Sequence, residues 1–125
     1  MATVALTLDT FEKTILEGGT VFVDFWAGWC GPCLQFAPNY EAAAEANPDF
    51  TFAKVDTEDQ QQLAAARNIT SIPTIMAFKD GIGVFAQPGA LPRPMLDELI
   101  SQVRALDMEQ VRADLAKQEA EEASA

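Results

Sequence analysis

Histidine is absent from this chain of 125 residues, and only two cysteines are present. A structural zinc site needs four ligands, so two thiols without a histidine cannot close such a site within one chain. A c-type haem site is excluded as well, because Leu34 and not histidine follows the second cysteine. We therefore predict no metal and no haem, and only a metal shared between two chains stays open.

Cations are also scarce: eight Lys and Arg stand against 19 Asp and Glu, and the formal net charge is −11. Binding to nucleic acid by phosphate neutralisation requires a basic surface, which this composition does not supply. An anionic membrane would repel the chain, and no apolar run reaches the roughly 18 residues of a membrane-spanning helix. We expect neither partner and interpret the acidity as a source of solubility, with attraction to a basic protein surface as the alternative.

The first residues contain no basic stretch and reach an acid at Asp9, so they do not have the form of a signal peptide. We therefore expect a cytoplasmic protein. Thiols are kept reduced in that compartment, and a cysteine pair there is more often functional than structural.

Hydrophobic residues make up 49% of the chain, and their pattern predicts one α/β domain. The predicted order is β-α-β-α-β-α-β-β-α, in which parallel crossovers are followed by a hairpin and a closing helix. Strands are predicted over residues 3–8, 21–26, 51–55, 74–79 and 82–86, and helices over 9–17, from the cysteines to about 47, over 58–67 and from about 94. Asp9 with Glu12 has the form of a capping box, and Asp80-Gly81 has that of a hairpin turn.

The last part of the chain differs in composition, so we predict a domain over residues 1–106 and an extension over 107–125. The extension holds six acids and two bases, and Met108, Val111 and Leu115 recur at helical spacing. A solvated, helical extension is the simpler interpretation, and a docking arm for a partner is the alternative.

Both cysteines lie in Cys30-Gly31-Pro32-Cys33, between an apolar strand and a helix. A disulfide that closes so short a loop adds little stability, which argues against a purely structural role. Cys30 is expected at the helix N-terminus, where free amides and the helix dipole favour a thiolate, and Cys33 one turn further in. We predict an exposed nucleophile at Cys30 and a buried resolving thiol at Cys33, with Pro32 in the first helical turn.

Asp24 is a carboxylate inside the otherwise apolar strand 21–26. Such a group is costly to bury without a task or a partner, and an edge position facing water is the alternative. If it lies beneath the cysteines, burial raises its pKa and allows it to exchange a proton with Cys33. Lys54 on a neighbouring strand is the candidate partner, and a surface lysine is the alternative.

The segment from Val23 to Cys33, VDFWAGWCGPC, resembles the active-site segment of the thioredoxin family. Later landmarks of that family follow in order and spacing: Pro38, Ile72-Pro73-Thr74, Phe78-Lys79-Asp80-Gly81 and Gly89-Ala90-Leu91. The resemblance covers about residues 3–106. It implies a thioredoxin fold, with a central mixed sheet flanked by helices, and a protein-disulfide reductase that maintains cell redox homeostasis without a bound cofactor.

The resemblance also implies roles for individual residues. Cys30 would attack a substrate disulfide, Cys33 would resolve the mixed disulfide, and Asp24 assisted by Lys54 would relay the proton. Ile72-Pro73 would hold a cis peptide facing the cysteines. The apolar contact surface for substrates would consist of Trp29, Gly31, Pro32, Ile72, Pro73, Gly89 and Ala90.

The partners implied by the resemblance are an NADPH-dependent flavoprotein thioredoxin reductase and oxidised proteins such as peroxiredoxins, methionine sulfoxide reductases and ribonucleotide reductase. We expect a monomer. Leu34 departs from the cation that many members of the family carry there, which predicts a slightly less favoured thiolate and weaker docking to acidic partners. The alternatives are a thiol oxidase or isomerase on the same fold, and a binding module that docks through the extension.

Overall fold

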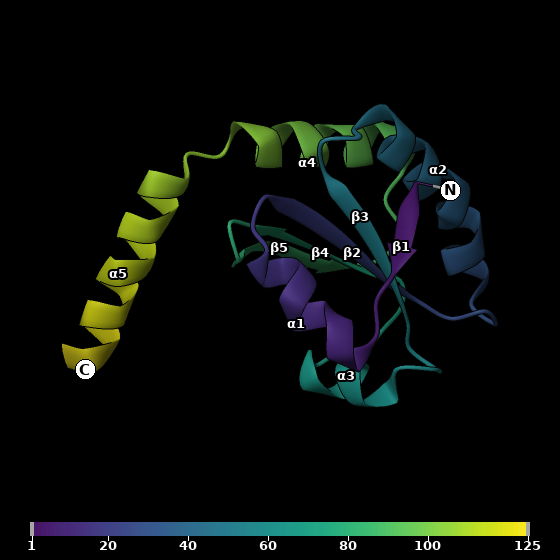
Figure 1. The fold of residues 1–125 in the computed structure, drawn as a ribbon, viewed down its shortest axis with the longest axis horizontal. Helices are drawn as coiled ribbons and strands as arrows, with labels where there is room; N and C mark the ends of the chain where they lie inside the picture. Colours follow the sequence, from purple (N-terminus) through teal and green to yellow (C-terminus); the bar gives the residue numbers. More distant parts are fainter. Residues whose placement is uncertain (1, 125) are drawn as a thin grey trace.

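A five-stranded mixed sheet forms the centre of the protein in a computed structural model that describes residues 2–124 (Figure 1). The strands are β1 (Thr3–Ala5), β2 (Thr20–Trp26), β3 (Thr51–Asp56), β4 (Thr74–Lys79) and β5 (Ile82–Pro88), in the spatial order β1-β3-β2-β4-β5. β1, β3 and β2 are parallel, whereas β4 is antiparallel to β2 and β5 to β4. The predicted mixed α/β sheet is confirmed, although the connection through residues 57–73 leads to an antiparallel strand and not to a parallel crossover.

Helices cover both faces of this sheet (Figure 1). α1 (Leu8–Leu16) and α3 (Gln61–Ala66) pack on one face, and α2 (Gly31–Ala46) and α4 (Arg93–Ala105) pack on the other. β2 explains the two apolar clusters, because Phe22 points to the α2 side and Val23 to the α1 side. Asp24 follows the same alternation and therefore faces the α2 side.

Several element boundaries differ from the predicted ones by one to three residues, and three of these differences have a visible cause. The N-cap of α1 is Thr7, whose backbone N–H donates to the Thr10 hydroxyl at 2.9 Å, so the capping box does not involve Asp9 and Glu12. β1 ends at Ala5, before the predicted residue 8, because the chain already enters the cap of α1 at Thr7. α3 begins only at Gln61, because Asp56 accepts the N–H groups of Glu58 and Asp59 and holds these residues in a turn.

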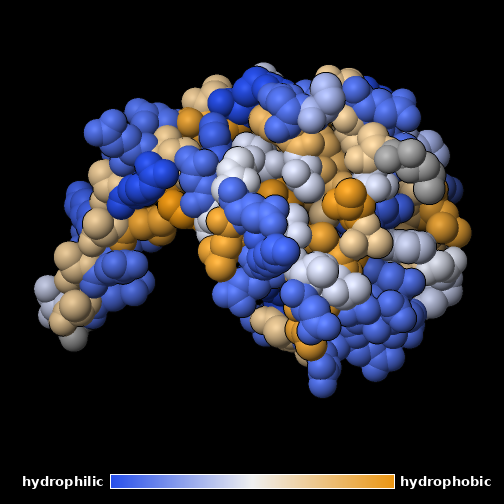
Figure 2. All heavy atoms as spheres, viewed as in Figure 1, coloured by the Kyte–Doolittle hydropathy of each residue, from blue (hydrophilic) through white to orange (hydrophobic). Residues whose placement is uncertain are grey.

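The extension forms a fifth helix, α5 (Met108–Ser124), attached near the β4–β5 turn. Lys79 donates its ammonium to the carbonyl oxygens of Val103, Arg104 and Leu106 at 2.8–3.1 Å, and Met108 is buried. Figure 2 shows α5 standing apart from the body along most of its length, with apolar side chains on the side that faces the body. No helix within residues 2–124 is long and apolar enough to cross a membrane.

We expect Lys79→Met to lower the free energy of unfolding by about 1–3 kcal/mol, since three carbonyls at the end of α4 lose a charged donor. Urea unfolding measures the change. Lys117→Met is the matched control, because the Lys117 side chain is exposed and forms no hydrogen bond or ion pair with any described residue. Equal stability of the two variants would contradict a capping role for Lys79.

Candidate active site

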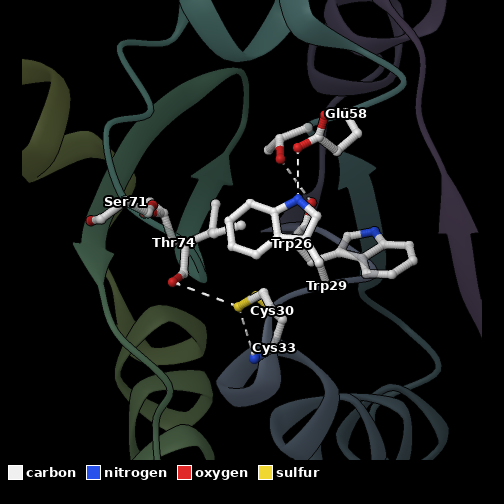
Figure 3. The surroundings of a disulfide bond; sticks show 9 residues. Trp26, Trp29, Cys30, Cys33, Glu58, Ser71 and Thr74 are labelled. Carbon is white, nitrogen blue, oxygen red and sulfur yellow. Dashed lines mark hydrogen bonds between the residues drawn. A yellow bond between two sulfur atoms is a disulfide. The ribbon is translucent and has the colours of Figure 1, made fainter.

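Cys30 and Cys33 form a disulfide, so the structure describes the oxidised protein (Figure 3). Their Cα atoms are 5.2 Å apart. Parallel strand β2 delivers the chain to this point: it ends at Trp26, and α2 begins at Gly31. The redox pair therefore sits at the carboxyl edge of the sheet and at the amino end of a 16-residue helix.

Cys30 is the N-cap residue of α2, as predicted. Its Sγ accepts a hydrogen bond from the backbone N–H of Cys33 at 3.2 Å, and Pro32 occupies the first turn of the helix. No acidic residue is present in that turn. Once the disulfide is reduced, these features stabilise a negative charge on the Cys30 sulfur, because free amides and the helix dipole both favour an anion.

The prediction that Cys30 is exposed is wrong for the oxidised form. Its exposed fraction is 5% and that of Cys33 is 1%, because both pack into an apolar cluster with Ala27, Trp26 and Ile72. Cys30 is still the more accessible of the two cysteines. Its Sγ lies 3.8 Å from the carbonyl oxygen of Ile72, at the edge of the cluster.

Asp24 is fully buried, so the alternative of an edge position facing water is excluded. It lies in the middle of β2, paired with Lys54 of β3 and Ile75 of β4, and neither carboxylate oxygen has a hydrogen-bond partner among the described residues. Burial raises the pKa of Asp24 from 3.8 to about 7, and the positive charge of Lys54 partly offsets that rise.

Lys54 does not form an ion pair with Asp24 in this structure. Its ammonium lies over the Trp26 ring, 4.6 Å from the centroid, in a cation–π contact. Asp24, Trp26 and Lys54 are on the same face of the sheet, so Lys54 acts on Asp24 through its field alone. The predicted proximity is present and the direct pairing is not.

The peptide bond between Ile72 and Pro73 is cis, as the resemblance implied. The N–H of Gly89 donates to the Pro73 carbonyl at 2.8 Å, which brings the loop of Gly89 and Ala90 next to the cis bond. Trp29, Gly31, Pro32, Gly89 and Ala90 are exposed, Ile72 is half-buried and Pro73 is buried. Pro73 thus supports the predicted contact surface from below.

Trp29 is 70% exposed and is held by a residue that the sequence reasoning missed. Its indole N–H donates to the Glu58 carboxylate at 2.6 Å (Figure 3). A signal was available, because Trp29 follows β2 and Glu58 follows β3, and adjacent parallel strands bring their carboxyl ends to one edge.

A redox pair at a helix N-terminus, beside a cis proline and an exposed aromatic side chain, defines a thiol–disulfide oxidoreductase.

Comparisons with known proteins agree with this class. The thioredoxin family model matches residues 2–105. A Streptomyces coelicolor protein assigned as thioredoxin 2 is 54% identical over 120 residues, which are 96% of this chain and 90% of that protein. The thioredoxin of Mycoplasma genitalium is 38% identical over 101 residues, which are 81% of this chain and 99% of that protein.

Solved structures give the same result. The X-ray structure of Fasciola hepatica thioredoxin has a TM-score of 0.75 at 40% identity and covers 80% of this chain and 98% of its own. The solution structure of oxidised Plasmodium falciparum thioredoxin has a TM-score of 0.74 at 34% identity and covers 82% and 99%. The chain belongs to the thioredoxin family and is a protein-disulfide reductase with Cys30 and Cys33 as its redox-active pair.

The extension has a counterpart in one of these relatives. At most five residues of this chain lie outside the alignment with the Streptomyces coelicolor protein, so that alignment includes most of α5.

Among residues 2–124 no group of three or more His, Cys, Asp or Glu is placed to hold a metal ion.

Proposed function

We propose that Cys30 is the nucleophile of this reductase, that Cys33 is the resolving thiol and that Asp24 accepts the proton of Cys33. The observation that carries the first assignment is the hydrogen bond from the Cys33 N–H to the Cys30 Sγ at the start of α2. The third assignment is supported by a buried carboxyl group that has no hydrogen-bond partner among the described residues and a pKa of about 7.

The reaction proceeds by two exchanges of sulfur partners. The Cys30 thiolate attacks one sulfur of the substrate disulfide, and the other substrate sulfur leaves as a thiolate that takes up a proton. Cys33 then transfers its proton to the Asp24 carboxylate and attacks the Cys30 Sγ, which releases the second substrate sulfur as a thiolate. That thiolate also takes up a proton from solvent, and Asp24 later gives its proton back to solvent. The substrate gains two electrons and two protons, and the protein is left with the Cys30–Cys33 disulfide.

Substrate is bound by the surface that Trp29, Gly31, Pro32, Ile72, Pro73, Gly89 and Ala90 form or support. The hydrogen bond to Glu58 keeps the Trp29 indole fixed while most of its surface stays exposed. A flat, largely apolar surface of this kind suits an extended polypeptide better than a small molecule. The positive charge of Lys54 lowers the pKa of Asp24, the proton acceptor.

The partners in this proposal are an NADPH-dependent flavoprotein thioredoxin reductase and oxidised proteins such as peroxiredoxins, methionine sulfoxide reductases and ribonucleotide reductase. One solved neighbour is described in a study of thiol resolution in a yeast mitochondrial 1-Cys peroxiredoxin through glutathione and thioredoxin systems, and it is 30% identical with a TM-score of 0.74. We place the protein in the cytoplasm, where it carries electrons as a monomer. Residues 1–106 are its redox domain, and residues 107–125 are an acidic extension.

In the reduced protein at pH 7, we expect iodoacetamide to alkylate Cys30 at least about ten times faster than Cys33. The helix N-terminus favours the Cys30 thiolate, and burial protects Cys33. Mass spectrometry of digests after short labelling times gives both rates. The same experiment in urea is the control, since unfolding removes both effects and equalises the rates. Equal rates in the folded protein would overturn the division of roles.

A further inference from the structure

A groove of about 720 Å³ runs between β1 and α2. We call it the β1–α2 groove. Val4 lines it from β1, Leu34 and Pro38 line it from α2, and Trp26 and Lys54 line it from the neighbouring strands. Val4 and Leu34 expose 46% and 50% of their surface, which is unusual for two apolar side chains on one feature.

The groove adjoins the cluster that holds the redox pair, and Trp26 belongs to both. Trp26 packs against the cluster of Ala27, Cys30 and Cys33 and also lines the groove, and Leu34 directly follows Cys33 in α2. The opposite end of the α2 wall is Glu41, seven residues along the helix from Leu34, or about 10 Å. An extended polypeptide advances about 3.3 Å per residue, so roughly three residues of a bound chain would lie along this wall.

The charges around the groove are mostly negative. Glu41, Asp56 and Asp59 line it, whereas its only lining cation among the described residues is Lys54. The Lys54 ammonium lies over the Trp26 ring, 4.6 Å from its centroid, so this one cation is already in contact with an aromatic side chain. A bound segment therefore gains from an apolar side chain in the groove and from a positive charge beside it.

We propose that the β1–α2 groove is a second substrate subsite, which takes an apolar side chain flanked by Lys or Arg from a protein whose disulfide is reduced at Cys30. The proposal rests on the function proposed above, because the site matters only while a substrate is joined to Cys30. It adds a preference that the surface around Trp29 and Ile72 does not supply. It also gives the exposed Leu34 a role as the rim residue of this subsite.

Synthetic peptides with one cysteine, each joined to 2-nitro-5-thiobenzoate by a disulfide, provide the test. Attack by reduced Cys30 on the peptide sulfur releases the coloured thiol, so its appearance reports kcat/KM. A series carries one Leu-Lys pair at successive positions on each side of the cysteine, in an otherwise serine background. We expect one position to react about tenfold faster than the all-serine peptide, as burial of most of a leucine side chain predicts. A Leu-Glu pair at that position should lose most of the gain.

Val4→Thr and Leu34→Gln should remove the gain and leave the rate with the all-serine peptide unchanged. Leu16→Gln is the matched control: Leu16 is 65% exposed at the end of α1 and does not line the groove, so the gain should persist. The proposal is overturned if no position reacts faster, if the gain survives both groove variants, or if these variants slow every peptide equally. Failure of the unmodified protein to release thiol from the all-serine peptide would instead contradict the proposed function.

Discussion

In a Cys33→Ser variant we expect turnover of a protein disulfide to fall by at least about 10³-fold and a mixed disulfide between Cys30 and the substrate to accumulate. Release of the substrate normally depends on a thiol held within the same molecule, and such positioning corresponds to very high effective concentrations. Without Cys33, release waits for a thiol from solution. Intact-mass spectrometry and non-reducing gels detect the adduct, and reduction of insulin measures the turnover.

The matched control is Cys30→Ser, which should also be inactive but should form no stable adduct. Cys33 lies one turn inside α2 and is less exposed than the N-cap residue Cys30, so we expect it not to attack a substrate disulfide on its own. Both substitutions exchange sulfur for oxygen at nearly constant volume, and equal thermal stability of the reduced variants would show that the fold is retained. The assignment is contradicted if Cys33→Ser turns over normally, or if Cys30→Ser is the variant that traps substrate. Mass spectrometry of the adducts would also identify which oxidised proteins this reductase meets.

Much of the site followed from local sequence because its chemistry depends on local structure. Local sequence favours a thiol at a helix N-terminus in Cys30-Gly31-Pro32-Cys33, since Pro32 suits the first helical turn and the strand before it is strongly apolar. The same reasoning identified Asp24 as anomalous, and its complete burial confirms that it lies inside the protein. Strand β4 was predicted to the residue, because its hydrophobic run ends at the Asp80-Gly81 turn.

Tertiary contacts account for what the sequence did not predict. Thr7 caps α1 in place of Asp9, because the path of the chain after β1 brings the Thr7 N–H within reach of the Thr10 hydroxyl. Cys30 is buried because Ile72, 42 residues further along the chain, folds against it. The contact between Trp29 and Glu58 likewise needs the parallel pairing of β2 and β3, and periodicity alone does not specify that pairing.

Asp24→Asn should stabilise the protein at neutral and alkaline pH. The pKa of Asp24 is raised from 3.8 in the unfolded chain to about 7 in the folded protein, chiefly by burial. Between those values the folded state binds the extra proton, so the contribution of Asp24 to stability is fully present below about pH 4 and is lost as pH rises to about 7. A pKa difference of about three corresponds to about 4 kcal/mol above pH 7. Asparagine remains neutral and avoids that loss.

Urea unfolding of the oxidised protein from pH 4 to pH 8 measures this effect. The stability difference between Asp24→Asn and the unsubstituted protein should be near zero at pH 4 and reach its full value at pH 8. Asp49→Asn is a control of opposite sign, because the hydrogen bond from Arg104 lowers the pKa of Asp49. That variant should be the less stable one throughout this range, because the contribution of Asp49 is lost only as the pH falls below about 3.8.

The same substitution at Asp24 should slow the chemistry. The neutral asparagine side chain would not accept the proton of Cys33, so resolution of a mixed disulfide should be about 10- to 100-fold slower near pH 7.5, within the range that a general base contributes. Single-turnover measurements, followed by the fluorescence of Trp26 and Trp29, give this rate. In the unsubstituted protein the rate should rise as Asp24 ionises around pH 7, and in the variant that rise should be missing. A variant that gains stability at pH 8 but resolves at the normal rate would show that Asp24 is buried for a reason other than proton transfer.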